Sequence, residues 1–158
     1  MTLPDDIYSQ SILELAAAMP RTARLALPEA TAKAHSKLCG STVAVDLVME
    51  GDVVTDYGQS VKACLLGQSA ASVMGREIVG STATELRAVG SAMRRMLKED
   101  GSPPEGKWRD LAVLEPVRNY KARHASILLV FDAVEDAIAQ IEAKRAEEAE
   151  APRPEEHV

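Results

Sequence analysis

Residues 42–62 read TVAVDLVMEGDVVTDYGQSVK, and this stretch decides the fold. Every second residue of its first half is apolar, which predicts a half-buried strand over residues 42–49. The apolar positions are Val43, Val45, Leu47 and Met49. The sequence Glu-Gly-Asp at 50–52 is typical of a tight turn, and the β-branched residues of 53–62 predict the return strand. The stretch therefore predicts a β-hairpin.

The segments beside the hairpin predict one more strand and several helices. Residues 30–38 alternate loosely and predict a first strand, whereas residues 5–18 combine an acidic start with apolar residues at helical spacing. After the hairpin, small and apolar residues at helical spacing predict a helix over 65–78. A capping-box sequence predicts another over 82–99.

The last third of the chain predicts a short helix, a long helix and a tail. Residues 107–114 hold the only Trp and predict a short helix that Pro116 ends. Over 121–146 one apolar stripe recurs in steps of four and three, as expected for a long amphipathic helix. The stripe consists of Ile127, Phe131, Val134, Ile138 and Ile141. Residues 147–158 are acidic and contain proline, so we expect a disordered tail after a single domain over 1–146.

Element order and composition define the class of protein. One helix, three strands and then several helices predict an α+β fold, a three-stranded antiparallel sheet with helices packed on one face. The formal net charge of −6 argues against binding to nucleic acid. No stretch reaches the roughly 18 apolar residues that a membrane span needs. The N-terminus shows no basic region followed by an apolar run, so we expect a cytoplasmic protein.

The chain has only two cysteines, Cys39 and Cys64, and the hairpin lies between them. With the turn centred between Glu50 and Gly51, position 39 lies across from about position 62. Both thiols are therefore expected at the same end of the sheet. In a chain without a secretory signal, neighbouring thiols indicate metal or sulfur chemistry more than a structural disulfide. The alternative is that each cysteine serves only as a small buried apolar residue.

Three histidines complete the candidates. His124 opens the long helix, and a metal held by two thiolates would accept such a nitrogen. An exposed or capping residue is the alternative there. We expect His35 in the first strand to face solvent, and His157 to be solvated in the tail. The sequence has no glycine-rich phosphate loop, no His-x-x-x-His pair and no Gly-x-Ser-x-Gly elbow, so we assign no catalytic residue.

Two stretches resemble a known family. LCGSTVAVDLVMEGDVVTDYGQSVKACLLGQSAASVM (38–74) and ARHASILLVFDAVEDAI (122–138) are similar to the iron–sulfur cluster assembly scaffolds of the NifU N-terminal, IscU and SufU type. The resemblance covers roughly residues 5–142 and implies the SufE/NifU-like fold, which is of the α+β class described above.

The resemblance also implies which residues correspond to the family's ligands. Cys39 matches the first family cysteine and Cys64 the second, but the third is missing. With Ser-Ile-Leu kept in register, His124 matches the family histidine and Ala125 the third cysteine. A shift of one residue places His124 in the third-cysteine position instead. Ser41 stands where the family has an aspartate, and a serine hydroxyl is a much poorer metal ligand.

The resemblance implies a scaffold or carrier rather than an enzyme. It would hold iron, a transient iron–sulfur cluster or a zinc ion through Cys39, Cys64 and His124. The implied partners are a cysteine desulfurase, other iron–sulfur assembly proteins and a second copy of the chain, with no nucleic acid and no membrane. One alternative is a degenerate scaffold-fold binding protein that docks to a desulfurase or assembly partner without carrying a cluster. Another is a small thiol enzyme that accepts persulfide sulfur on Cys64.

Overall fold

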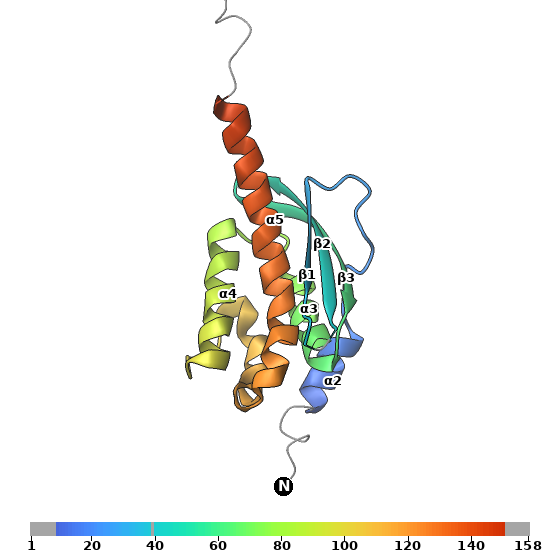
Figure 1. Cartoon of the computed structure of the whole chain (residues 1–158), viewed down its shortest axis with the longest axis vertical. Helices are drawn as coiled ribbons and strands as arrows, with labels where there is room; N and C mark the ends of the chain where they lie inside the picture. Colours follow the sequence, from blue (N-terminus) through green and yellow to red (C-terminus); the bar gives the residue numbers. More distant parts are fainter. Residues whose placement is uncertain (1–8, 39, 151–158) are drawn as a thin grey trace, which may run out of the picture.

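The computed structural model describes residues 9–38 and 40–150. Three strands form one antiparallel sheet in the order β1-β2-β3, and the long helices cover one of its faces (Figure 1). The elements are α2 (Gln10–Ala17), β1 (Ala30–His35), β2 (Thr42–Glu50), β3 (Val53–Lys62), α3 (Leu65–Glu77), α4 (Ala83–Lys98), η1 (Gly106–Asn119), η2 (Lys121–Arg123) and α5 (His124–Glu150). The predicted α+β class and the three-stranded sheet are confirmed.

The hairpin forms where the sequence predicts it, but in another register. The turn lies at Gly51 and Asp52, and a β-bulge falls between Val48 and Met49. Thr42 consequently pairs with Lys62, whereas the expected register placed position 39 there. Both shifts have local causes, because the turn is centred one residue later than expected and the bulge adds one residue to the return strand.

Helix boundaries follow the capping residues. Helix α2 begins after Ser9, whose hydroxyl accepts a hydrogen bond from the amide of Ile12 at 3.3 Å. Residues 1–8, which hold the acidic start expected for this helix, lie outside the described residues. The hydroxyl of Thr82 accepts from the amide of Glu85 at 3.1 Å and caps α4 as predicted. The carboxylate of Glu85 bonds elsewhere, so only half of the capping box forms.

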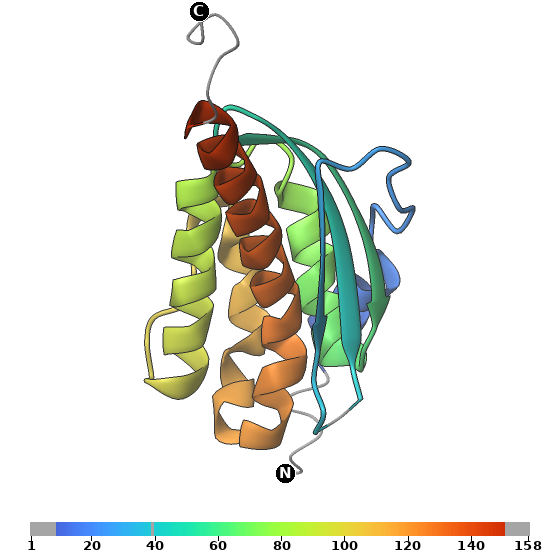
Figure 2. The same ribbon diagram turned by 45° about the horizontal axis from the view of Figure 1, so that its top comes forward.

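Helix α5 is the central element of the helical layer. It packs on β1, β2, α3 and α4, between the sheet and α4 (Figure 2). Every residue of the predicted apolar stripe is at most 1% exposed. The helix continues to Glu150, four residues beyond the expected end, so 147–150 are helical rather than part of a tail, and 151–158 lie outside the described residues. No helix within the described ranges is long and apolar enough to cross a membrane.

The segment η1 is a 3₁₀-helix that passes through Pro116, where a helix end was expected. Its buried side chains recur every third residue: Trp108, Leu111, Leu114 and Val117. A 3₁₀-helix has about three residues per turn, so this spacing places all of them on one face. Burial of that face explains why the segment takes the 3₁₀ form. It also explains why the segment continues through Pro116, although proline has no N–H to donate a backbone hydrogen bond.

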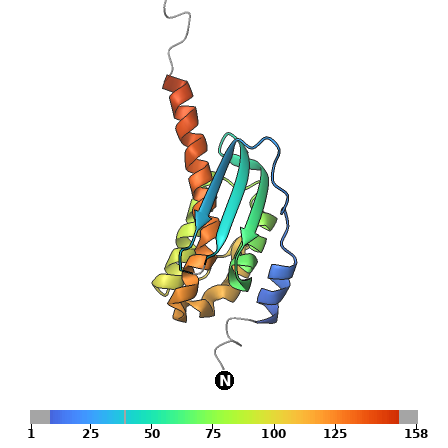
Figure 3. The same cartoon turned by 45° about the vertical axis from the view of Figure 1, so that its right-hand side comes forward.

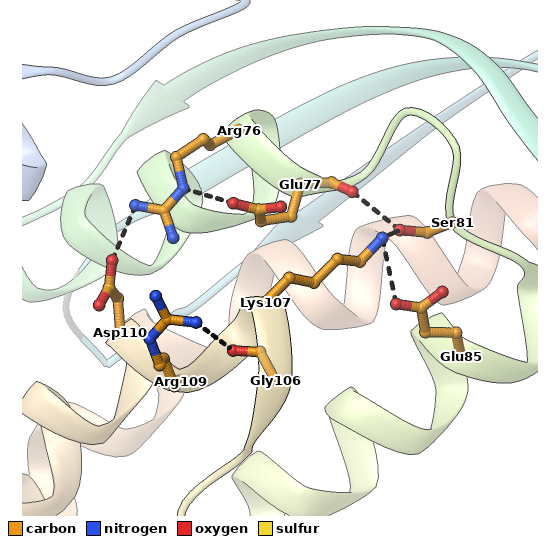
Figure 4. Close-up of polar contacts among 8 residues, drawn as sticks. All are labelled: Arg76, Glu77, Ser81, Glu85, Gly106, Lys107, Arg109 and Asp110. Atoms are coloured by element: carbon orange, nitrogen blue, oxygen red, sulfur yellow. Dashed lines mark hydrogen bonds and ion pairs between the residues drawn. The ribbon is translucent and has the colours of Figure 1, made fainter.

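Polar contacts tie η1 to the neighbouring helices (Figure 4). The ammonium of Lys107 donates to the hydroxyl of Ser81 at 2.6 Å and pairs with the carboxylate of Glu85 at 3.1 Å. Arg76 of α3 pairs with Asp110 of η1 at 2.8 Å. These contacts hold η1 against the C-terminal end of α3 and the N-terminal end of α4.

The segment of residues 18–29, which connects α2 to β1, runs beside the sheet (Figure 3). The guanidinium of Arg24 donates two hydrogen bonds to Asp46 of β2, at 2.6 and 2.9 Å. The amide of Leu25 and the hydroxyl of Thr31 also donate to this carboxylate. The bonds from Arg24, aided by those from Thr31 and Leu25, lower the pKa of Asp46 to about 2. Strand β2 is therefore covered at Asp46, where the sequence alternation predicted an exposed face.

Candidate metal centre

A thiol and two hydroxyls meet at the end of the sheet where β2 begins. The sulfur of Cys64 lies 3.3 Å from Oγ of Ser126, and that oxygen lies 3.5 Å from Oγ of Ser41. The three side chains come from the start of α3, the first turn of α5 and the residue before β2. Both serines are buried and Cys64 is partly exposed. We call Ser41, Cys64 and Ser126 the thiol cluster.

Cys64 occupies the N-cap position of α3. Its backbone is extended, with φ −68° and ψ 173°, and its side chain makes no capping hydrogen bond. The sulfur is therefore directed away from the first turn of its own helix and towards α5. The positive end of the helix dipole lies beside it, and this end stabilises negative charge on a metal-bound sulfur.

Gly67 allows α5 to approach the thiol so closely. A Cβ at this position would lie 2.7 Å from Oγ of Ser126 and 2.8 Å from Cβ of Ala63. Both distances are shorter than a van der Waals contact, so only glycine fits here. The small residues that follow Cys64 pack closely, since all of them are buried: Gly67, Ser69, Ala70, Ala71 and Ser72.

Cys39, the other expected thiol ligand, lies outside the described residues. The residues before and after it are described. The amide of Ser36 donates to the carbonyl of Ser41 at 2.9 Å, and the amide of Gly40 donates to the carbonyl of Ser36 at 2.8 Å. Gly40 has a φ of +73°, a conformation that glycine adopts without strain. The two backbone hydrogen bonds hold Ser41 where its hydroxyl contacts Ser126.

His124 is buried at the first position of α5 but faces η1. Its Nε2 lies 3.0 Å from the carbonyl oxygen of Val117 and 3.2 Å from that of Arg118. Carbonyl oxygens only accept hydrogen bonds, so Nε2 carries a proton and donates it to them. The structure shows no hydrogen bond between His124 and Cys64.

Ser126, rather than His124, contacts the sulfur of Cys64. It lies two residues further along α5, or about 200° around the helix from His124. No sequence pattern singled out Ser126, although it belongs to the Ser-Ile-Leu motif that set the register. His35 is exposed as predicted and contacts Thr42 of the neighbouring strand, with Nδ1 3.2 Å from the hydroxyl oxygen. His157 lies outside the described residues.

No group of three or more His, Cys, Asp or Glu side chains within residues 9–38 and 40–150 is placed to hold a metal ion. Two of the three expected ligands, Cys64 and His124, are described, and the third is not. The ligand set of Cys39, Cys64 and His124 therefore stays a prediction.

The comparisons with known proteins agree with this fold. The crystal structure of the N-terminal part of a nitrogen-fixing NifU-like protein from Brucella abortus has 59% sequence identity and a TM-score of 0.89, and the match covers 90% of this chain and 99% of that one. The iron–sulfur cluster assembly scaffold protein IscU of Thermotoga maritima is 26% identical over 137 residues, 85% of this chain and 94% of that protein.

A SUF-system scaffold from Fervidobacterium islandicum AW-1 shares the fold, with a TM-score of 0.77 and 21% identity over 85% of this chain and 98% of that one. No protein-family model matches the chain. The fold, the thiol at the start of α3 and the Brucella relative define the class. The chain belongs to the NifU/IscU-like family of iron–sulfur cluster assembly scaffolds.

Proposed function

We propose that this chain is a scaffold or carrier in iron–sulfur cluster assembly and not an enzyme. It would bind iron, a labile cluster or a zinc ion through Cys39, Cys64 and His124. The observation that carries the proposal is the position of Cys64, whose sulfur contacts Ser126 in the first turn of α5, the turn that also holds His124 and Ala125. The relative from Thermotoga maritima is named as a scaffold of this kind.

The donor atoms of these residues suit iron or zinc. Thiolates and imidazoles are the usual ligands of both metals in proteins. Nε2 of His124 donates to backbone carbonyls, and metal-bound histidines are commonly oriented in this way, with the other nitrogen left for the metal. In the sequence Cys39 stands two positions before Ser41, and Ser41 belongs to the thiol cluster.

Two departures from the family pattern leave this chain with fewer metal ligands than the family's usual set. Ser41 replaces the aspartate, and Ala125 replaces the third cysteine in the register that keeps Ser-Ile-Leu. Two thiolates and one imidazole hold a metal less firmly than a complete set of four ligands. Such a site suits a protein that releases its cargo to a partner, and it calls for a ligand from outside the chain.

Metal analysis after anaerobic reconstitution tests the proposal. Freshly purified protein is incubated with zinc, or with iron and sulfide, desalted and assayed for metal per chain and by absorption spectroscopy. We expect about one zinc or one cluster in the wild type and a large loss in Cys39→Ala, Cys64→Ala and His124→Ala. His35→Ala is the matched control, because this histidine is exposed on β1. Equal metal content in the wild type and the Cys39→Ala, Cys64→Ala double variant would refute the proposal.

A second function is favoured by the hydroxyl of Ser41 and the methyl group of Ala125, which stand where the family has metal-binding groups. It is a scaffold-fold protein that docks to a cysteine desulfurase or another assembly partner without carrying a cluster. Pull-down with a purified desulfurase distinguishes the two functions. Retention of the partner by the double cysteine variant, together with absence of metal in the wild type, favours the docking function.

A further inference from the structure

A small open cavity lies on the face of the sheet that the long helices do not cover (Figure 3). Its volume is about 200 Å³, and we call it the sheet pocket. Thr42, which lines it, directly follows Ser41 of the thiol cluster, and the pocket therefore lies at the same end of the sheet as Cys64. The lining residues are Arg24, Lys33, Thr42, Ala44, Ser60 and Lys62.

The register of the strands explains the hollow. Lys33 of β1, Ala44 of β2 and Ser60 of β3 pair side by side and form one row across the sheet. This row faces away from the helices, because the residues next to Ala44 on β2, Val43 and Val45, lie in the core. The methyl group of Ala44 is the shortest side chain of the row, so it forms a floor between longer side chains on both sides.

The sheet pocket has an excess of positive charge. The charge of Arg24 is neutralised by Asp46, to which the guanidinium donates two hydrogen bonds. Lys33 and Lys62 are exposed, and neither forms an ion pair with any residue in 9–38 and 40–150. They stand on the two outer strands, which lie about 10 Å apart across β2. Two uncompensated ammonium groups therefore flank the pocket.

Charge and size together favour a carboxylate of a partner protein as the occupant. The chain has a formal net charge of −6, so an acidic protein is repelled in most orientations and attracted where ammonium groups are uncompensated. The volume is below the roughly 300–1,000 Å³ of sites that hold small-molecule ligands. The pocket is thus large enough for a side-chain carboxylate and too small to enclose a cofactor.

Building on the scaffold function proposed above, we propose that the sheet pocket binds a carboxylate side chain in an acidic segment of a partner protein. The ammonium groups of Lys33 and Lys62 contact the carboxylate from two sides, above the methyl group of Ala44, and the hydroxyl of Ser60 donates to it. The partner is thereby oriented at the end of the sheet that holds Cys64.

The first experiment measures binding of an acidic probe to the metal-free full-length protein. The probe is a fluorescein-labelled peptide of four Glu-Glu-Ala repeats, followed by fluorescence polarisation at low salt. We expect about tenfold weaker binding in the Lys33→Gln, Lys62→Gln double variant, as two partly screened ion pairs are lost. The matched control is Lys98→Gln, Lys121→Gln, which removes the same charge from the helical layer and should lower the affinity much less.

Two results of this experiment overturn the proposal. One is equal loss of affinity in both double variants, and the other is failure of the wild type to bind the acidic peptide more tightly than a peptide of four Gln-Gln-Ala repeats. Neither result depends on metal, so this proposal and the metal-binding function can fail separately.

The second experiment tests the hollow itself. Ala44→Leu fills the floor without changing the charge, and we expect it to weaken peptide binding by a similar factor while chemical denaturation shows a folded protein. Ser60→Val fills the pocket from the neighbouring strand and replaces Ala44→Leu if that variant is unstable. Undiminished binding in the folded variant would mean attraction by net charge alone and overturns the pocket.

Inorganic phosphate distinguishes a docking surface from a site for a free anion. At equal ionic strength, phosphate should displace the peptide no better than chloride does, because salt then acts only by screening. Displacement by micromolar phosphate that is lost in the Lys33→Gln, Lys62→Gln variant would assign the pocket to a free anion and overturn the docking proposal.

Discussion

The two ends of helix α3 differ in how their polar side chains are satisfied. At the C-terminal end, Arg76 pairs with Glu77 at 2.6 Å and with Asp110 at 2.8 Å, and Ser81 lies between Lys107 and the carbonyl of Glu77 (Figure 4). At the N-terminal end, the hydrogen-bond partner of the Cys64 sulfur among the described residues is a hydroxyl, Oγ of Ser126 at 3.3 Å, and Oγ of Ser41 lies 3.5 Å beyond it.

The polar cluster at the C-terminal end of α3 stabilises the fold, whereas the cluster at the N-terminal end can bind a ligand. At the C-terminal end, Arg76 and Lys107 form ion pairs with neighbouring carboxylates. Their charges are therefore neutralised within the fold. The thiol at the N-terminal end lies beside a hydroxyl and not beside an opposite charge. Its sulfur can therefore still bind a metal cation. We therefore expect substitutions at the C-terminal end to change stability alone, and substitutions at the N-terminal end to change metal binding.

The largest change in stability is expected from Gly67→Ala at the N-terminal end. The added methyl group would collide with Ser126 and Ala63 and push α5 away from α3. We expect the free energy of unfolding to fall by about 2 kcal/mol, measured by chemical denaturation. Gly90→Ala in α4 is the control, because its methyl group would meet the flexible ends of two side chains, Glu135 and Arg94. Equal stability of both variants would contradict the tight approach of α5 at Gly67.

At the C-terminal end, Lys107→Met should lower stability without changing metal content. The substitution removes the hydrogen bond to Ser81, the ion pair with Glu85 and the stacking over Trp108, whose ring centre lies 5.5 Å from the ammonium. We expect a loss of about 1–2 kcal/mol in thermal or chemical unfolding. Lys33→Met on the exposed face of β1 should be nearly neutral. Loss of zinc in Lys107→Met would show that the two ends are not independent.

Ser126→Ala should have the opposite effect, a change in metal binding with little change in stability. The hydroxyl contacts the sulfur of Cys64, and removal of such a partner typically weakens metal binding by about tenfold. Competition with a chromophoric zinc chelator measures this affinity, and Ser102→Ala in an exposed loop is the control. Unchanged zinc affinity in Ser126→Ala would assign the hydroxyl a packing role only.

Local sequence patterns predicted the elements better than their mutual positions. The alternation in 42–49 and the stripe on α5 mark side chains that lie in the core, so both elements could be predicted. The sequence did not show that β2 is buried on both faces, or that every residue of α5 from Ser126 to Phe131 is buried. The register of the hairpin could not be predicted, because a bulge between Val48 and Met49 leaves no mark in the alternation. The 3₁₀ form of η1 had a signal in the spacing of Trp108, Leu111, Leu114 and Val117, which a search for helical spacing overlooks.

In the candidate site, too, the local position of a residue could be predicted but its neighbours in space could not. Cys64 at the start of α3 could be predicted, because the change of period after the strand marks that junction. The direction of His124 could not, because it depends on the carbonyls of η1, whose path is set by tertiary packing. Whether Ser126 or His124 faces the thiol is likewise decided by the rotation of α5 against α3, which Gly67 permits.

The smallest expected effect concerns the pH dependence of the C-terminal end. Burial alone would raise the pKa of Glu85, but hydrogen bonds from Trp108, at 3.0 Å, and from Lys107 outweigh it and lower the pKa. The folded state thus favours the ionised carboxylate. Its contribution to stability is complete above the ordinary pKa of a glutamate and is lost as the pH falls through the lowered value.

Glu85→Gln measures this contribution by difference. The variant should be less stable than the wild type at pH 6, by under about 1 kcal/mol because the carboxylate is partly exposed and screened by solvent. The gap should close as the pH falls and Glu85 takes up its proton, because the protonated side chain resembles glutamine. It should be smaller throughout in a Lys107→Met background. Unfolding curves of both proteins across this range test the expectation. A gap that stays constant with pH would mean that the cluster at this end of α3 acts through shape rather than through charge.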